Sequence, residues 1–98
     1  MLVHIVMFKF KEENKKANII QAKQMLENLM GAVSSLKSID VGINFIEADR
    51  AMDLSIIASF DSKGGLDAYD EHPEHQKVVT FIKSVAEYSK ACDYHRES

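Results

Sequence analysis

Four stretches of the chain have the residue pattern of β-strands. Residues 2–10 are rich in valine, isoleucine and phenylalanine and are apolar on both faces, which predicts a strand that needs cover on both sides. Residues 36–47 and 52–60 alternate apolar and polar positions, and the polar segment 48–51 between them predicts a hairpin. A brief closing strand is expected at residues 91–95.

Helical periodicity fills the two intervals between these strands. From Asn14 to Val33, apolar residues recur every three to four positions, as in a helix that packs one face on a core. A short helix is expected at residues 66–71, and Pro73 must end it because proline removes a backbone donor and clashes with the preceding turn. Pro73 also suits the first position of a second helix, whose apolar stripe extends to Val85.

The predicted order is βαββαβ, which is the order of ferredoxin-like α+β folds. We expect residues 1–98 to form one domain, with a four-stranded antiparallel sheet and two helices on one of its faces. The other face has no helix to cover it, although the first strand is apolar on both sides. A second copy of the chain is the simplest cover, so the sequence predicts a homodimer.

Composition and charge exclude several classes of protein. The 98 residues are 46% apolar and 28% charged, which is typical of a folded domain. The net charge of −3 gives no general attraction to nucleic acid, and the strand at 52–60 has no basic residue of the kind an RNA-binding sheet needs. The apolar runs are shorter than the ~20 residues of a membrane span. One cysteine, Cys92, and no secretory signal at the N-terminus favour a cytoplasmic protein.

Chemically useful side chains concentrate between Tyr69 and His75. In a regular helix these two residues would lie about 240° apart at ~100° per residue, so they can share a pocket only if Pro73 redirects the chain. His75 would then lie in the first turn of the second helix, where the helix dipole favours a neutral ring. A neutral imidazole can act as a general base next to a carbonyl group. His72, before the proline, is expected to be a turn or capping residue.

Each of these residues also has a structural interpretation. His4 lies in the middle of an apolar strand and must either find a hydrogen-bond partner or face a cavity. Tyr69 and His75 can equally bridge the core and solvent or cap a helix. A metal site built from His72, Glu74, His75 and His95 is a further alternative, although their spacing crosses the helix break and does not match a zinc-protease motif.

The sequence resembles the stress-responsive dimeric α/β-barrel (Dabb) domain family from end to end. The similarity is carried by the opening run HIVMFKFK at 4–11, by Val41-Gly42, by SFDS at 59–62 and, most specifically, by AYDEHPEHQKVV at 68–79. The resemblance implies a ferredoxin-like protomer whose sheet packs against that of a second copy to close a barrel. It agrees with the dimer inferred from the first strand.

For function, the resemblance implies two alternatives. Most members of the family have no assigned activity, whereas one plant branch comprises cofactor-free polyketide cyclases. The positions that match the residues lining the cavity of those cyclases are His75 as general base, Tyr69 as donor to a carbonyl or enolate oxygen, and His4 as a hydrogen-bonding wall residue. Unlike those cyclases, this chain has no aromatic residue between Ala17 and Met30, so an aromatic polyketide fits it poorly.

We therefore expect a homodimer with a small cavity between its two sheets and no assigned molecular role. The alternative is a cofactor-independent cyclase, isomerase or lyase that acts on a small carbonyl or aromatic compound through His75. A haem- or quinone-directed monooxygenase is a third option. No cofactor and no metal are expected. An enzyme predicts that His4, Tyr69 and His75 converge on an open cavity, and a structural protein predicts that backbone groups satisfy these side chains.

Overall fold

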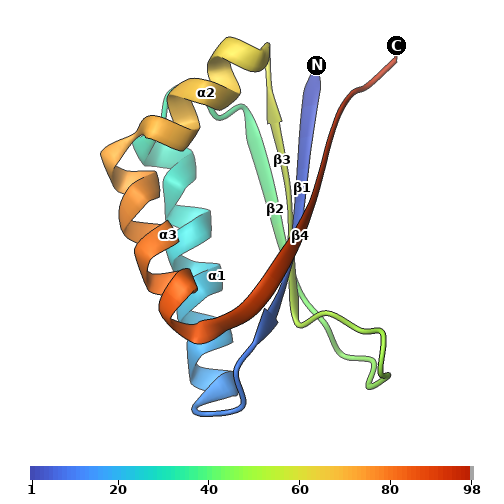
Figure 1. Cartoon of the computed structure of the whole chain (residues 1–98). Helices are drawn as coiled ribbons and strands as arrows, with labels where there is room; N and C mark the ends of the chain where they lie inside the picture. The colour runs from blue at the N-terminus through green and yellow to red at the C-terminus, as the bar shows by residue number, and fades with distance from the viewer. Residues whose placement is uncertain (98) are drawn as a thin grey trace.

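The computed structural model describes residues 1–97 as one sheet covered by helices on one side (Figure 1). The strand order is β2-β3-β1-β4, and all neighbouring strands are antiparallel. The predicted ferredoxin-like arrangement is therefore confirmed. The elements in chain order are β1 (Leu2–Phe10), α1 (Lys15–Ala32), β2 (Ser38–Ile43), β3 (Leu54–Phe60), α2 (Lys63–Glu71), α3 (Pro73–Val85) and β4 (Ala86–His95).

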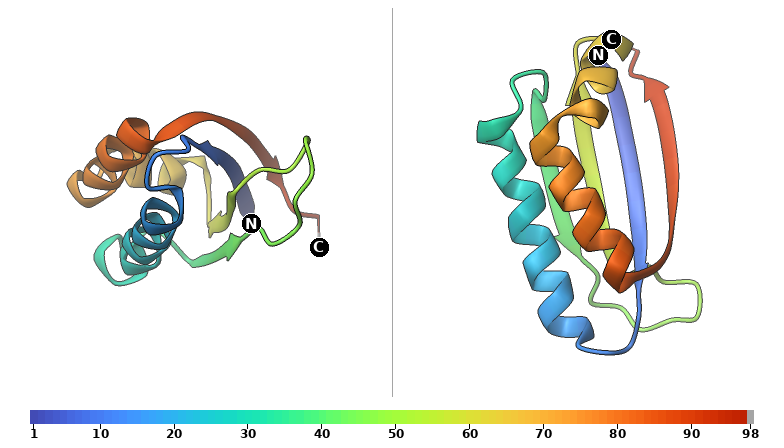
Figure 2. Two further views of the ribbon diagram at one scale, coloured as in Figure 1. Left: turned by 90° about the horizontal axis from the view of Figure 1, so that it is seen from below. Right: turned by 60° about the vertical axis from the view of Figure 1, so that its left-hand side comes forward.

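The core lies between the sheet and the helices, which all cover the same face of the sheet (Figure 2). Side chains alternate across a strand, so the even-numbered positions of β1 and β3 point toward the helices. Phe10, Leu54 and Phe60 are among the largest fully buried side chains. From α1, the residues at helical spacing complete this core: Ile19, Ala22, Leu26 and Leu29.

The predicted hairpin has shorter strands and a longer loop than the alternation suggested. β2 ends at Ile43 and β3 begins at Leu54, so residues 44–53 form a loop. Phe45, which the alternation includes in the second strand, lies in this loop and is 88% exposed, so the predicted extent of that strand was wrong. At the end of the loop, the backbone N–H of Asp53 bonds to the Phe8 carbonyl and its carboxylate accepts a bond from the Phe10 N–H. Asp53 is therefore held against β1.

The closing strand is longer than predicted, because β4 begins at Ala86, directly after α3. It pairs with β1 along nearly all of its length, with a change of register between Lys9 and Phe10. Most of its side chains are exposed and polar, so its first half lacks the apolar alternation that marks a strand in sequence.

The second face of the sheet is open. Met7, Ile57 and Tyr94 are each 40–43% exposed there. The 44–53 loop projects on the same side, away from the helices (Figures 1 and 2). In residues 1–97, none of the helices combines the length and the apolar character that crossing a membrane would require.

Candidate active site

The site is built around the break between α2 and α3. His72 separates the two helices in an extended backbone conformation, and Pro73 occupies the start of α3. The His72 ring caps α3, since its Nδ1 accepts a hydrogen bond from the Glu74 N–H at 3.1 Å. This bond satisfies one of the backbone donors that every helix leaves free at its N-terminus. The predicted break at Pro73 and the predicted capping role of His72 are both confirmed.

The break brings Tyr69 and His75 into contact. Their ring centroids are 4.1 Å apart and the ring planes are tilted by 37°. On its other side, Tyr69 packs against Phe60 of β3, with 5.1 Å between the ring centroids. The two residues would point in different directions on one continuous helix, so the redirected chain is what allows this contact.

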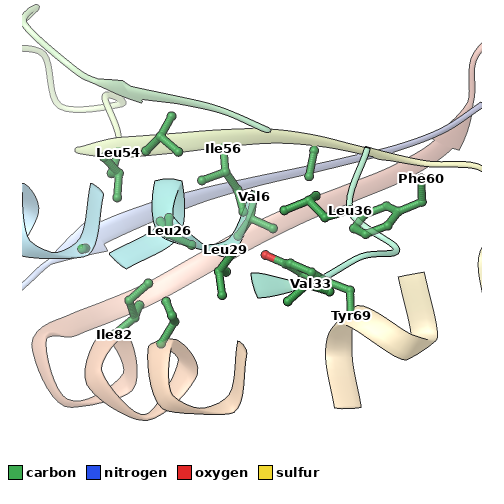
Figure 3. Close-up of a cluster of buried hydrophobic side chains, with 14 of the residues drawn as sticks. Val6, Leu26, Leu29, Val33, Leu36, Leu54, Ile56, Phe60, Tyr69 and Ile82 are labelled. Atoms are coloured by element: carbon green, nitrogen blue, oxygen red, sulfur yellow. The ribbon is translucent and has the colours of Figure 1, made fainter. Parts of the chain in front are cut away.

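Tyr69 is fully buried, and its hydroxyl has no hydrogen-bond partner within the part of the chain that the structure describes. Its side chain extends from α2 into the core cluster between the helices and the sheet (Figure 3). Burial raises the pKa of Tyr69, so the phenol keeps its proton at neutral pH. A protonated phenol in an apolar environment is a hydrogen-bond donor without an acceptor.

His75 is held next to the break by the backbone. Its Nδ1 lies 3.4 Å from the carbonyl oxygen of Asp70, the residue that follows Tyr69. Burial lowers the pKa of His75, and this effect outweighs the hydrogen bond and the nearby charge of Asp70, which act in the opposite direction. His75 is therefore a neutral ring at pH 7, as its place in the first turn of α3 suggested.

His4 lies in the middle of β1 on the face that points toward the helices. The register of the sheet places it directly opposite Asp93 of β4, and its Nδ1 is hydrogen-bonded to the Asp93 carboxylate. Asp93 lies within the closing strand expected at residues 91–95 but was not predicted as a site residue. Only the pairing of β1 with β4 brings it to His4, and the residue pattern of one strand does not contain that register.

A pocket of about 360 Å³ lies between the sheet and α3, and both His4 and His75 line it. Tyr69 does not line the pocket; it packs behind His75. The pocket belongs to a single protomer, on the helix-covered face of the sheet, whereas the sequence analysis placed a cavity between the sheets of two copies. Most of its lining is apolar: Val6, Phe8, Leu26, Ile56, Val78, Val79, Ile82 and Ala86.

A larger groove of about 560 Å³ lies elsewhere, between the 44–53 loop and the start of α1. It is lined by Lys9, Lys15 and Lys16 together with apolar side chains, and none of the predicted site residues is among the residues that line it. In residues 1–97, no three histidine, cysteine or acidic side chains gather in a way that could hold a metal ion.

The fold and the residues of the helix break together define a ferredoxin-like α+β barrel domain. The sequence profile of the stress responsive A/B barrel domain (Dabb) matches residues 2–96, and the chain belongs to this family. No curated protein matches the chain in sequence.

Solved structures with the same fold include proteins with and without a named activity. A dimeric ferredoxin-like protein of unknown function from Bacteroides fragilis is 25% identical, with a TM-score of 0.87 over 97% of this chain and 95% of that one. A second such dimeric protein, from Thermobifida fusca, is 24% identical, with a TM-score of 0.85 over 95% and 88% of the two chains. The hydroxynitrile lyase of Passiflora edulis is 20% identical, with a TM-score of 0.85 over 99% and 94%. At that identity the lyase shows a likeness of fold alone.

Proposed function

We propose that this protein is a cofactor-independent enzyme that transfers a proton on a small carbonyl compound. The observation that carries the proposal is the pocket with two imidazoles in its wall and an unpartnered phenol packed directly behind one of them. Proton abstraction next to a carbonyl needs a base and a donor for the oxygen that becomes negative. The imidazoles supply the first group and the Tyr69 hydroxyl supplies the second.

The pocket restricts the substrate class. Its volume of about 360 Å³ is near the lower end of the ~300–1,000 Å³ range of ligand pockets. Its mainly apolar lining favours a compound with a hydrocarbon portion and few polar groups. A small ketone or aldehyde, with its carbonyl group toward the histidines, has this combination of properties.

The unpaired hydroxyl of Tyr69 separates this proposal from a purely structural role. A structural protein is expected to satisfy its buried polar groups, since an unpaired one costs about 1–3 kcal/mol. Because Tyr69 lies behind the wall of the pocket, a substrate oxygen has to reach past the His75 ring to accept the bond that the protein itself leaves unmade. The structural alternative, in which Tyr69 and His75 only stabilise the helix break, explains their stacking and the bond of His75 to the Asp70 backbone carbonyl, but not the free hydroxyl of Tyr69.

We also propose that the protein is a homodimer formed through the open face of the sheet. Apolar side chains on that face, including Met7 and Ile57, support this assembly, and two structurally similar proteins are dimeric. The negative net charge disfavours nucleic acid as a partner. The single cysteine favours a cytoplasmic location.

The test is hydrogen–deuterium exchange at the carbon next to a carbonyl group. Benzylacetone, an aliphatic aldehyde and a β-keto ester are incubated with the protein in D2O, and loss of the α-proton signal is followed by NMR. We expect the wild-type protein to accelerate exchange on at least one of them. Tyr69→Phe should lower the catalysed rate by about tenfold to a thousandfold. The upper part of this range is the loss seen when one oxyanion-hole donor is removed, and the lower part applies to a weaker hydrogen bond.

Tyr94→Phe is the matched control, because it removes the same hydroxyl from an exposed position on the open face. It should exchange protons at the wild-type rate. Chemical-shift changes at pocket residues report binding separately from catalysis. Binding without accelerated exchange, or a Tyr69→Phe variant as active as wild type, would overturn the proposal.

A further inference from the structure

The two imidazoles of the pocket have different partners. His4 Nδ1 is hydrogen-bonded to the carboxylate of Asp93, and an ionised carboxylate can only accept a hydrogen bond. The proton of a neutral His4 ring must therefore be on Nδ1. Its Nε2 is left with a lone pair, and the His4 side chain, which is 15% exposed, lines the pocket.

A positive charge is stabilised on one ring and opposed on the other. When His4 accepts a proton at Nε2, it becomes an imidazolium in contact with the negative Asp93 carboxylate. His75 faces a carbonyl dipole rather than a carboxylate, and it sits in the first turn of α3, where the helix dipole opposes positive charge. Burial lowers the pKa of His75, and the nearby His4 and His72 add to this effect.

We infer that His4 is the ring that takes the proton from the substrate and that Asp93 is the residue that positions it. The inference rests on the proposed function, and it transfers to His4 the role of general base that the sequence analysis gave to His75. His75 remains neutral and contacts Tyr69. Other charged groups lining the pocket are Lys83 at the end of α3 and Glu87 at the start of β4.

The step is a proton transfer with no other reactant. The C–H bond next to the carbonyl breaks, its proton moves to Nε2 of His4, and its electron pair is delocalised onto the carbonyl oxygen as an enolate. Where that oxygen reaches past the His75 ring, the Tyr69 hydroxyl donates a hydrogen bond to it. In D2O the ring exchanges its proton with solvent and returns a deuteron to the carbon, which restores the ketone and the neutral ring.

The first experiment locates the proton without a substrate. Nitrogen-15 NMR of the labelled full chain distinguishes the two neutral tautomers of a histidine from its imidazolium form. We expect neutral His4 to carry its proton on Nδ1. In Asp93→Asn the amide can donate to Nδ1 as well as accept from it, so the preference of His4 for the Nδ1–H tautomer should weaken.

Asp67→Asn is the matched control, since Asp67 is an exposed residue of α2 that pairs with Lys63. It should leave the tautomer of His4 unchanged. The inference is overturned if neutral His4 carries its proton on Nε2, or if Asp93→Asn leaves its preference for the Nδ1–H tautomer as it was.

The exchange assay with benzylacetone, or with the carbonyl compound that exchanges fastest, then separates this inference from the proposed function. Asp93→Asn should lower kcat by at least about tenfold with little change in KM, because orientation of the base matters in the transition state. If wild type is active and His75→Gln abolishes activity while His4→Gln and Asp93→Asn retain it, the function stands and the inference fails. If wild type accelerates exchange on none of the compounds, the proposed function fails, whichever tautomer His4 adopts.

Discussion

His75 makes the stability of the protein depend on pH. Burial holds its pKa in the folded state below the ordinary value of 6.5. Below about pH 6.5 the unfolded chain therefore binds this proton more readily than the folded chain, and unfolding takes up a proton. The contribution of His75 to stability is therefore complete above about pH 6.5, and it is lost as the pH falls through the pKa of His75 in the folded state.

We expect the free energy of unfolding to decrease more steeply for wild type than for His75→Gln between about pH 7.5 and about pH 5.5. Urea titrations at the two values measure this, and the change within each protein cancels the cost of the substitution itself. His95→Gln, at an exposed position at the end of β4, should behave as wild type. Equal slopes for wild type and His75→Gln would mean that His75 is not buried as a neutral ring.

Individual residues of the site could be predicted from the sequence where their type was unusual for their surroundings. His4 differs from the rest of an apolar strand, and Tyr69 and His75 flank a proline. Asp93 gave no such signal, because an acidic residue in a polar segment is ordinary. Only the β1–β4 register brings it to His4, and register is a property of two strands that a residue pattern within one of them does not contain.

At the scale of elements, the break between α2 and α3 depends on a side-chain cap. The His72 ring accepts a hydrogen bond from the Glu74 N–H, and Pro73 has no backbone N–H that would need an acceptor. We expect His72→Ala to lower the free energy of unfolding by about 1 kcal/mol, as other lost helix caps do. His72→Asn, which offers an amide oxygen to the same N–H, should recover most of this loss. Urea unfolding of the three proteins provides the comparison.

The same cap should affect the contact between Tyr69 and His75, because both rings are positioned by the chain direction at residue 72. The ring-current shift of the His75 side-chain protons reports that contact by NMR. It should decrease in His72→Ala and persist in His72→Asn. If His72→Ala is as stable as wild type and keeps the shift, the proline alone sets the break and the His72 ring has no structural role.

The elements differ in how well the sequence predicted them. Proline has a fixed steric effect, so the break at residue 73 was predicted at the correct residue. The end of β2 and the start of β3 were not, because alternation continues through Phe45 after the strand pairing has stopped at Ile43. The beginning of β4 was missed for the opposite reason: an exposed edge strand needs backbone pairing and little apolar periodicity.

At the scale of the whole molecule, the sequence predicted the topology and the presence of an uncovered face. Apolar residues on both sides of β1 were the signal, and the structure places Met7 on the open face and Val6 in the core. The sequence could not decide which side of the sheet holds the pocket. That depends on how closely α3 packs on the sheet, and the lining of this pocket comes from five separate elements.

The open face and the pocket lie on opposite sides of the sheet, so a change that prevents dimer formation should leave the pocket intact. Ile57 is 41% exposed on the open face, and a lysine there would place two charges in an apolar interface related by symmetry. We expect Ile57→Lys to shift the protein from dimer to monomer in sedimentation-velocity runs at micromolar concentration. Phe45→Ser tests the same surface with little risk to the core, because Phe45 lies on the projecting loop and is 88% exposed.

The monomeric variant should keep the chemistry of the site. His4, Asp93 and His75 all come from one chain, and their contacts lie on the helix-covered side of the sheet. Exchange of α-protons per protomer, and the Nδ1–H tautomer of His4, should therefore persist in Ile57→Lys. A monomer with folded-state NMR dispersion but no exchange would show that the second copy completes the pocket. A variant that remains dimeric would place the interface on another surface, since a buried lysine pair at Ile57 is incompatible with a stable apolar contact.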